Sequence, residues 1–319
     1  MNKTTRFSVR INPDANGFTG RECPVKECEG YFKIQFGTGL PGQVPCHCPY
    51  CGHTGPHDEF YTKEQIEYAK SVAMHQITGQ FIRELKKLER RPDPHAFISI
   101  GVKVEGRPLP IRYYREKKLE TEVACNCCTL RYAIYGVFGY CPDCGVHNSL
   151  QILSANLDIV GKMLALSGEA DKEVADKFIE NALEDAVSSI DGFGREICKI
   201  YAAKSCGAAK AQNISFQNIA KARDQIISLF NINIAVPLAQ DEWSSLIRAF
   251  QKRHVIAHKM GVIDQLYVDT TGVSPFLIGR KIEIKPEEVS ELVKGLKKIA
   301  SYLSAQLSEL GTALDNGQN

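Results

Sequence analysis

The stretch that decides the fold of the N-terminal half is Cys46-His47-Cys48-Pro49-Tyr50-Cys51-Gly52-His53. Two cysteines separated by two residues, in a turn built from proline and glycine, are typical of a zinc knuckle whose two thiolates bind one tetrahedral ion. An earlier knuckle runs from Cys23 to Cys28, and a β-prone segment with glycines, residues 31–44, separates the two. Two knuckles joined by a hairpin-length insert predict a zinc ribbon. The expected ligands are Cys23, Cys28, Cys48 and Cys51.

A second pair of knuckles follows the first at Cys125-Asn-Cys127-Cys128 and Cys141-Pro-Asp-Cys144. Two-residue gaps suit a knuckle. The ligands that this spacing favours are Cys125, Cys128, Cys141 and Cys144. Neither set of four leaves an evident open coordination position, so we expect two structural Zn²⁺ ions and no catalytic metal. Neighbours that could replace a ligand are Cys46, His47, His53 and Cys127, and the alternative to a metal site is simple burial of inert cysteines.

Composition places the chain among globular proteins of the cytoplasm. Its 319 residues are 44% hydrophobic and 24% charged, with a net charge of +2. This length predicts two or three domains, and the small net charge gives no global attraction to polyanions. No apolar run approaches the length of a membrane span, and the first ten residues lack a signal-peptide core. Because disulfides are rare in the cytosol, the twelve cysteines need another explanation.

The rest of the N-terminal half contains few regular elements. Residues 6–12 alternate in polarity and residues 97–104 are apolar and β-branched, so both segments are predicted strands. Residues 63–91 have helical periodicity, and Pro92 and Pro94 end the predicted helix. Between residues 83 and 118 there are eleven Lys or Arg against five acidic residues, interleaved with Tyr113 and Tyr114. Such a stretch could follow a phosphate backbone while its rings stack on bases. A solvated helix face followed by an exposed hairpin is the alternative.

Helical periodicity takes over after residue 149, and cysteine and proline become sparse. The expected helices cover residues 154–166, 171–204, 215–230, 241–260 and 286–310. Asp241 is the N-cap candidate of the fourth helix, and Gly261 is its stop. The chain is therefore predicted to be multidomain, with small α+β zinc ribbons followed by an all-α helical bundle. The expected boundaries are 1–60 for the first ribbon, 61–95 for a linking helix, 96–150 for a strand segment and the second ribbon, and 151–315 for the bundle.

The fourth predicted helix ends in an unusual combination of side chains, Arg253-His254-Val255-Ile256-Ala257-His258. At 100° per residue, one arc of this helix is apolar and consists of Trp243, Leu246, Ile247, Phe250 and Ala257. Arg253 lies on one edge of this arc and His258 on the other, with His254 inside it. The pattern therefore predicts an apolar seam flanked by a fixed cation and a titratable imidazole.

The predicted helical bundle carries an Arg, a polar residue directly after it, and a His that follows the Arg after four to six intervening residues. With this motif the chain resembles the HEPN superfamily. The resemblance covers roughly residues 170–312, and the polar residue, Asn in many members, is His254 here. It implies a metal-independent endoribonuclease that works as a homodimer. Other members have lost activity or act as partner modules of nucleotidyltransferases. Stand-alone nucleases of this kind often serve as toxins held by an antitoxin, or in antiviral (anti-phage) defence.

The chemistry of these residue types agrees with RNA cleavage. Attack of a 2′-OH on the adjacent phosphate needs a base, an acid, and positive charge at the phosphorane; imidazole suits both proton roles near neutral pH. We assign proton transfer to His258 and transition-state charge to Arg253, whose guanidinium grips phosphate oxygens in a fork. His254 would position the substrate or take a second proton role. Pairing two protomers along the seam would bring two copies of this set together.

Other interpretations of the motif stay open. His254 and His258 could chelate a metal, although no acid or cysteine at ligand spacing completes a site. Alternatively His254 is a core histidine and Arg253 pairs with an acid on the long helix, for which the candidates are Glu180, Glu184 and Asp191. At the level of function, the competing hypothesis is a non-catalytic adaptor whose ribbons bind nucleic acid or protein and whose helical domain only dimerises. Expected partners are RNA, tRNA included, a second copy of the chain, and a protein partner such as an antitoxin; no membrane is expected.

Overall fold

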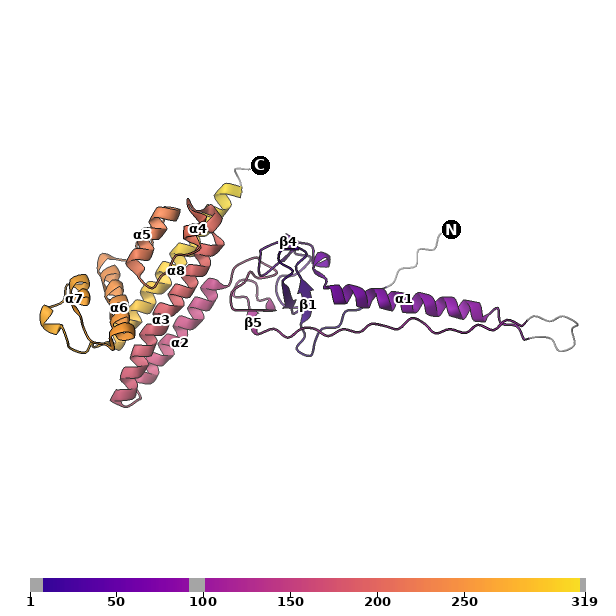
Figure 1. Cartoon of the computed structure of the whole chain (residues 1–319), viewed down its shortest axis with the longest axis horizontal. Coiled ribbons are helices and arrows are strands. Elements are labelled where there is room, and N and C mark those ends of the chain that lie inside the picture. The colour runs from indigo at the N-terminus through magenta and orange to yellow at the C-terminus, as the bar shows by residue number, and fades with distance from the viewer. Residues whose placement is uncertain (1–7, 92–100, 316–319) are drawn as a thin grey trace, which may run out of the picture. The chain divides into compact units, whose positions relative to one another are not determined.

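The computed structural model describes residues 8–91 and 101–315 and divides into two compact units, Met1–His147 and Asn148–Asn319 (Figure 1). The first unit contains a small sheet, and the second is entirely helical within its described residues. This part of the prediction is confirmed: a sheet-containing N-terminal half precedes an all-helical C-terminal half. Among the described residues, no helix has both the length and the apolar character needed to cross a bilayer.

One four-stranded antiparallel sheet organises the N-terminal unit. It consists of β1 (Thr19–Glu22), β2 (Tyr31–Ile34), β5 (Thr121–Ala124) and β6 (Arg131–Ile134), in the order β1-β2-β6-β5. The central pairing joins Ile34 to Tyr132, about a hundred residues apart along the chain. The two cysteine-rich regions therefore share one sheet. A two-stranded sheet of β3 (Cys46–His47) and β4 (Thr54–Gly55) and the 3-10 helix η1 (His57–Phe60) complete the elements near the first cysteines.

The two faces of this sheet have different neighbours. Phe32, Ile34, Tyr132 and Ile134 alternate onto one face, where they are buried together with Phe60 and the cysteines. The opposite face carries Tyr31, whose hydroxyl donates to Glu116, and Lys33, whose Nζ lies 2.8 Å from Oδ2 of Asp14. The metal-ligand candidates and most of the apolar core therefore lie on the same side of the sheet.

A long helix, α1 (Lys63–Lys86), follows the first pair of knuckles and ends five residues before the predicted end at 91. Thr62 and Gln65 form a capping box at its start. An extended segment runs back beside the helix: Leu109 N donates to Thr78 Oγ1 at 3.1 Å, and Arg112 N donates to Ser71 Oγ at 2.9 Å (Figure 1). The apolar side chains Ile66, Ile77 and Phe81 stay exposed.

Two predicted strands of this unit are absent from the residues that the structure describes. Residues 8–12 are irregular, and residues 1–7 lie outside the described part. Residues 92–100 of the second candidate also lie outside it, and residues 101–104 contribute only a single bridge between Val102 and Arg90. Short β-prone runs form strands only where a partner lies in register, and the described residues of these two runs find no partner beyond that single bridge.

The C-terminal unit packs its long helices around one core. These are α2 (Ser149–Ser167), α3 (Lys172–Ile200), α5 (Ile219–Phe230), α6 (Gln240–Lys259) and α8 (Pro286–Asp315). Apolar residues at helical spacing on α3, from Ile179 to Ile197, are buried against α2, α6 and α8. Shorter elements are α4 (Ala208–Ala211), α7 (Gln265–Thr271), and the 3-10 helices η2 (Ala202–Lys204) and η3 (Pro275–Leu277).

The predicted apolar arc of α6 is partly wrong. Trp243, Leu246 and Phe250 are buried as expected, but Ala257 is exposed and Val255 is buried instead. The cause is a second small core in which α7 and the following loop cover Val255. The chain enters α6 after Ala239 rather than Asp241, and the carboxylate of Glu242 accepts the Ala239 N–H at 2.9 Å. The last turn therefore presents a different face to solvent than simple periodicity predicts.

A buried carboxylate fixes the segment before α5 onto α3. Asp191 is 7% exposed and accepts from the backbone N–H of Phe216 at 2.6 Å and from the Ser215 hydroxyl at 3.1 Å. Next to it, the ring of Phe216 lies over Gly194, where a Cβ atom would come within 2.3 Å of the ring. Two residues earlier, a Cβ atom on Gly192 would meet nothing within 4 Å. The two helical glycines therefore differ sharply in their surroundings.

We predict opposite effects of alanine at these two glycines. Gly194→Ala should lower the free energy of unfolding of the helical unit by about 1–3 kcal/mol, because the ring of Phe216 must move. Gly192→Ala should raise it by up to about 1 kcal/mol, because alanine is the better helix former. Urea denaturation followed by the fluorescence of Trp243, the one tryptophan of the chain, reports this unit alone. Equal effects of the two changes would contradict the packing described.

Candidate metal centres and candidate active site

The eight cysteines predicted as ligands lie in two groups of four. Within each group, the four sulfur atoms lie within 4.8 Å of one another. The first group consists of Cys23, Cys28, Cys48 and Cys51, and the second of Cys125, Cys128, Cys141 and Cys144. The closest pairs are separated by 3.6 and 3.7 Å in the first group and by 3.5 and 3.7 Å in the second. Zn–S bonds of about 2.3 Å give a tetrahedron with edges of about 3.8 Å, whereas a disulfide needs about 2.05 Å. The groups therefore fit a tetrahedral ion and not disulfides.

All four knuckles are built in the same way. The first cysteine directly follows a strand or bridge residue, and the second precedes the returning strand or bridge by three residues. The backbone N–H of the first cysteine donates to the carbonyl oxygen two residues beyond the second. These bonds, of 2.8 to 3.0 Å, join Cys23 to Gly30, Cys48 to His53, Cys125 to Leu130 and Cys141 to Val146. The same backbone hydrogen bond therefore recurs in all four knuckles.

The residue after the second cysteine turns the chain in each knuckle with a positive φ. Two of these positions are glycines, Gly52 and Gly145, and two are not, Glu29 at 42° and Thr129 at 66°. L-residues pay a steric cost in this region, about 1–2 kcal/mol. A strained turn persists where the surrounding structure demands it. Here the positive φ is required because the two thiols of one knuckle must point to the same centre.

Burial shifts the pKa values of several clustered thiols. Removal from water raises the pKa of Cys23 to about 12 and raises those of Cys48 and Cys141 further. Burial also acts on Cys51, but hydrogen bonds from the His53 backbone N–H and the neighbouring thiols lower its pKa overall. Four thiols this close cannot all ionise without a cation, and a bound metal ion deprotonates coordinating thiols outright. The donor set is therefore suited to a divalent metal ion.

The neighbouring candidates lie outside the two groups of ligands. Cys46 is fully buried in β3, and burial raises the pKa of its thiol to about 12. Nδ1 of His47 lies 2.9 Å from the Thr54 hydroxyl, and the ring of His53 lies 6.0 Å from that of Phe60. Cys127 is exposed beside the second group. With four thiols in each group, both centres are closed, as structural zinc sites are.

We predict that the purified chain carries two Zn²⁺ ions. Replacing a ligand, as in Cys128→Ser, should leave one ion per chain, because a serine hydroxyl replaces a thiolate poorly. The matched control, Cys127→Ser, changes the exposed neighbour of that ligand and should leave two ions. Native mass spectrometry counts the ions directly. Two ions in both variants would contradict the assignment of Cys128.

The three predicted active-site residues lie in the last part of α6, inside the helical unit. The rings of His254 and His258 are exposed, with centroids 4.8 Å apart and planes at 56°. Arg253 is half-buried, and its Nε has no hydrogen-bond partner. The structure thus brings two imidazoles to one exposed face of a single helix, with an incompletely paired guanidinium at the residue before the first.

The alternatives to an active site find no support among the described residues. No ion pair is formed by Arg253; Asp191 pairs with Arg195, and Glu180 pairs with Lys177 and Lys281. His254 is exposed and is not a core histidine. No third ligand joins the two imidazoles within reach of one metal ion.

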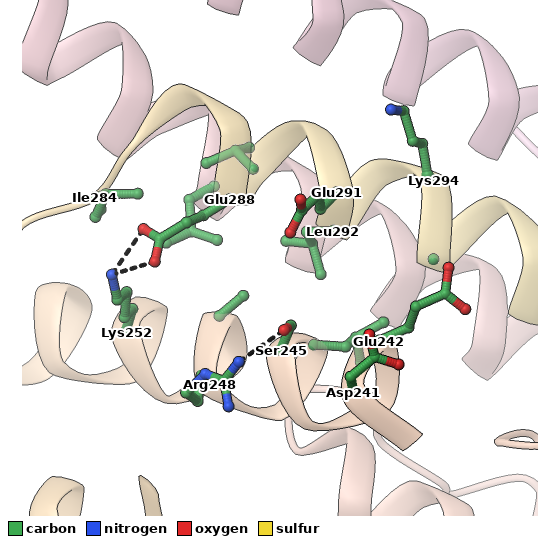
Figure 2. A pocket seen from close by; sticks show the side chains of 15 residues that line it. Asp241, Glu242, Ser245, Arg248, Lys252, Ile284, Glu288, Glu291, Leu292 and Lys294 are labelled. Atoms are coloured by element: carbon green, nitrogen blue, oxygen red, sulfur yellow. Dashed lines mark hydrogen bonds and ion pairs between the residues drawn. The ribbon is translucent and has the colours of Figure 1, made fainter. Parts of the chain in front are cut away.

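A separate pocket of about 420 Å³ lies between α6 and α8 (Figure 2), and neither His254 nor His258 lines it. Nζ of Lys252 lies 2.7 and 2.9 Å from the two carboxylate oxygens of Glu288 and donates to the Glu283 carbonyl oxygen at 2.7 Å. Burial opposes ionisation of Glu288, but its bonds with Lys252 and the Lys285 backbone lower its pKa overall. This pair ties the end of α6 to the start of α8. The sequence signal for this pair is the acidic first turn of α8, in which Glu288 is the second residue after Pro286.

The pair predicts a specific pH dependence of stability. Because the folded pKa of Glu288 is lowered, its contribution is present above the unfolded pKa of about 4.3 and is lost as pH falls through the folded value. Wild type should therefore exceed Glu288→Gln in free energy of unfolding by up to about 1 kcal/mol at pH 7, a small value because the pair is partly exposed. Trp243 fluorescence should show this difference shrink as the pH falls below the unfolded pKa of about 4.3. A difference that grows on acidification would contradict the pairing.

In comparisons with known proteins, no protein-family model, no curated protein and no solved structure matches this chain. The geometry of the chain itself must therefore carry any functional argument.

Proposed function

We propose that this protein is a metal-independent endoribonuclease of the HEPN type, whose zinc-bound N-terminal unit recognises the target or a partner. The observation that supports this best is the exposed pair His254 and His258 beside Arg253, all on the last turns of α6. Two imidazoles and one guanidinium are the groups that phosphodiester transfer to a neighbouring hydroxyl requires. HEPN membership rests on the motif and on its place late in the penultimate long helix of an all-helical unit.

The proposed reaction is an internal transesterification of RNA. One imidazole takes the proton of a 2′-OH while its oxygen forms a bond to phosphorus. The bond from phosphorus to the 5′-oxygen breaks, and a second imidazole, in its protonated form, donates the proton that this oxygen needs. The products are a 2′,3′-cyclic phosphate and a 5′-hydroxyl. No oxidant, metal ion or water takes part in the step.

Each residue has a role that its surroundings allow. His258 carries the proton transfer, and His254 lies close enough to take the second proton role or to hold the phosphate. Arg253, which is half-buried and forms no ion pair with a described residue, stabilises the phosphorane through the charge of its guanidinium; a group of this kind contributes roughly 3 kcal/mol to lowering a barrier. The exposed stretch of α6 that includes Ala257 suits pairing with a second copy, which would double the set of imidazoles.

A non-catalytic adaptor is the second candidate, favoured by features of the N-terminal unit. The phenol rings of Tyr113 and Tyr114 lie 6.0 and 5.6 Å from that of Tyr68, and Tyr113 is 80% exposed. Exposed tyrosines within a basic stretch can stack on bases of single-stranded nucleic acid. In this alternative, the ribbons and the basic stretch bind RNA or a protein, and the helical unit only dimerises. A role of the protein as a toxin or in antiviral defence belongs to the nuclease proposal alone. It rests on the resemblance to the HEPN superfamily.

Cleavage of RNA by matched variants tests the proposal. We predict that wild type cleaves a pool of tRNA and mixed RNA in EDTA, added briefly so that the structural zinc is retained, and leaves cyclic-phosphate ends. His258→Ala and Arg253→Ala should each lower the rate by about 10²- to 10³-fold. Arg248→Ala is the matched control, since it removes an exposed arginine from another face of α6 whose bond to Ser245 is local.

Zinc content and helical circular dichroism must be equal in all variants for the rates to be compared. A wild type that binds RNA as tightly as both active-site variants but never cleaves it would instead favour the adaptor. Equal loss of cleavage in Arg248→Ala would contradict the assignment of Arg253.

A further inference from the structure

The N-terminal unit contains an open pocket that none of the roles above uses. It measures about 1070 Å³ and lies over the outer end of the sheet, next to β1 and β2. Its walls are the glycine-rich loop of residues 36–45, the residues around η1, and Asp143 from the fourth knuckle. The loop is fixed to that knuckle, because Leu40 N donates to the Asp143 carboxylate at 3.0 Å and Gly39 leaves no room for a Cβ beside it.

A buried guanidinium forms the floor of this pocket. Arg21 in β1 is 3% exposed, and its carbon Cζ lies 4.9 Å from the ring centre of Phe36 and 5.1 Å from that of Tyr61. Nη1 donates to the Gly20 carbonyl oxygen at 2.7 Å, whereas Nε has no partner. No carboxylate forms an ion pair with Arg21 among the described residues. A buried cation with one backbone acceptor, no paired carboxylate and an unpartnered Nε is costly, so the site lacks a further group that accepts hydrogen bonds.

Two further polar atoms of the same pocket are buried without partners. They are Oε1 of Gln35, an acceptor, and Nδ1 of His57, which can accept when the proton is on the other ring nitrogen. Burial is the main cause that lowers the pKa of His57, and nearby Arg21 lowers it further, which favours the neutral ring. One donor and two acceptors without partners therefore belong to side chains that line a single cavity. Unsatisfied buried groups are rare in folded proteins, and their concentration here indicates a missing ligand.

The mixture of groups argues against a plain oxyanion. The carboxylates of Asp58 and Asp143 also line the pocket and would repel a phosphate. A planar heteroaromatic ligand fits better, because the exposed rings of Phe36 and Tyr61 offer it stacking surfaces. Among nucleobases, guanine has two adjacent acceptors, O6 and N7, on one edge, and these accept both hydrogen bonds of an arginine fork. Its other edge carries N–H donors, which the free acceptors of the pocket require.

We propose that this pocket binds a guanine base, held by the fork of Arg21 and stacked on Phe36 and Tyr61. Gln35 and His57 accept from the opposite edge of the base. The base comes either from a free guanine nucleotide or from an unpaired guanosine of RNA. The site is independent of cleavage at α6 and remains if the helical unit proves inactive.

Calorimetric titration of the zinc-loaded full chain with GMP and AMP tests the proposal. GMP should bind at least about tenfold more tightly than AMP, since the arginine fork discriminates between the two bases. Arg21→Lys retains the charge but loses the fork and should weaken GMP binding about tenfold. Phe36→Ala, a change of an exposed side chain that the fold tolerates, should weaken it at least about fivefold.

Two control variants match these changes elsewhere in the chain. Arg131→Lys alters an exposed arginine of the same sheet, and Phe276→Ala removes an exposed ring of the helical unit. Neither should alter GMP binding. Equal affinity for GMP and AMP, or GMP binding that Phe36→Ala leaves unchanged, would overturn the proposal, as would a wild type that binds neither nucleotide.

The source of the base follows from a second arm of the experiment. Single-stranded RNA pentamers with one central G or one central A are titrated against the same variants. If only the G pentamer competes with GMP, and Phe36→Ala loses both, the ligand is an unpaired guanosine of RNA. If neither pentamer competes while GMP still binds, the ligand is a free guanine nucleotide. Both results uphold the guanine pocket.

Discussion

The constraint on which the N-terminal unit depends is the convergence of four thiols at each of two points. The strands of its sheet are only four residues long, and cysteines make up nearly half of the buried residues in the core that covers them. So small a core stabilises a fold weakly unless a metal or disulfides reinforce it. An ion bound by the four thiols of a group would join cysteines that lie up to 28 residues apart and would hold turns with a positive φ at Glu29 and Thr129. We therefore expect metal binding and folding to be one process in this unit.

The helical unit is stabilised by different means and places the proposed active site at its edge. A large apolar core surrounds α3, and the buried carboxylate of Asp191 fixes the segment that leads into α5. The bond between Lys252 and Glu288 holds the end of α6 against α8. The main core ends before the last turns of α6, so His254 and His258 reach solvent. The helix is therefore held by packing and by an ion pair just before the motif, and it is exposed at the two histidines.

Local patterns predicted much of the fold, whereas long-range packing decided the rest. The spacing of cysteines sufficed to group the eight thiols, because each knuckle is a self-contained turn. The joining of Ile34 to Tyr132 in one sheet had no local signal, since register is set by tertiary contacts. On α6, Val255 is buried in place of the predicted Ala257 because α7 packs against it, and the helical periodicity of α6 gave no sign of this contact. The pocket over Arg21 was missed because its walls come from segments far apart in the chain.

Hydrogen exchange of the metal-depleted chain, compared with the zinc-loaded chain, tests most directly the claim that metal holds the first unit together. We predict that chelation removes protection from the amides of β1, β2, β5 and β6, while α3 and α8 keep theirs. Returning two equivalents of Zn²⁺ should restore the lost protection. If the sheet amides remain protected without metal, the apolar core alone stabilises the N-terminal unit and the central claim is wrong.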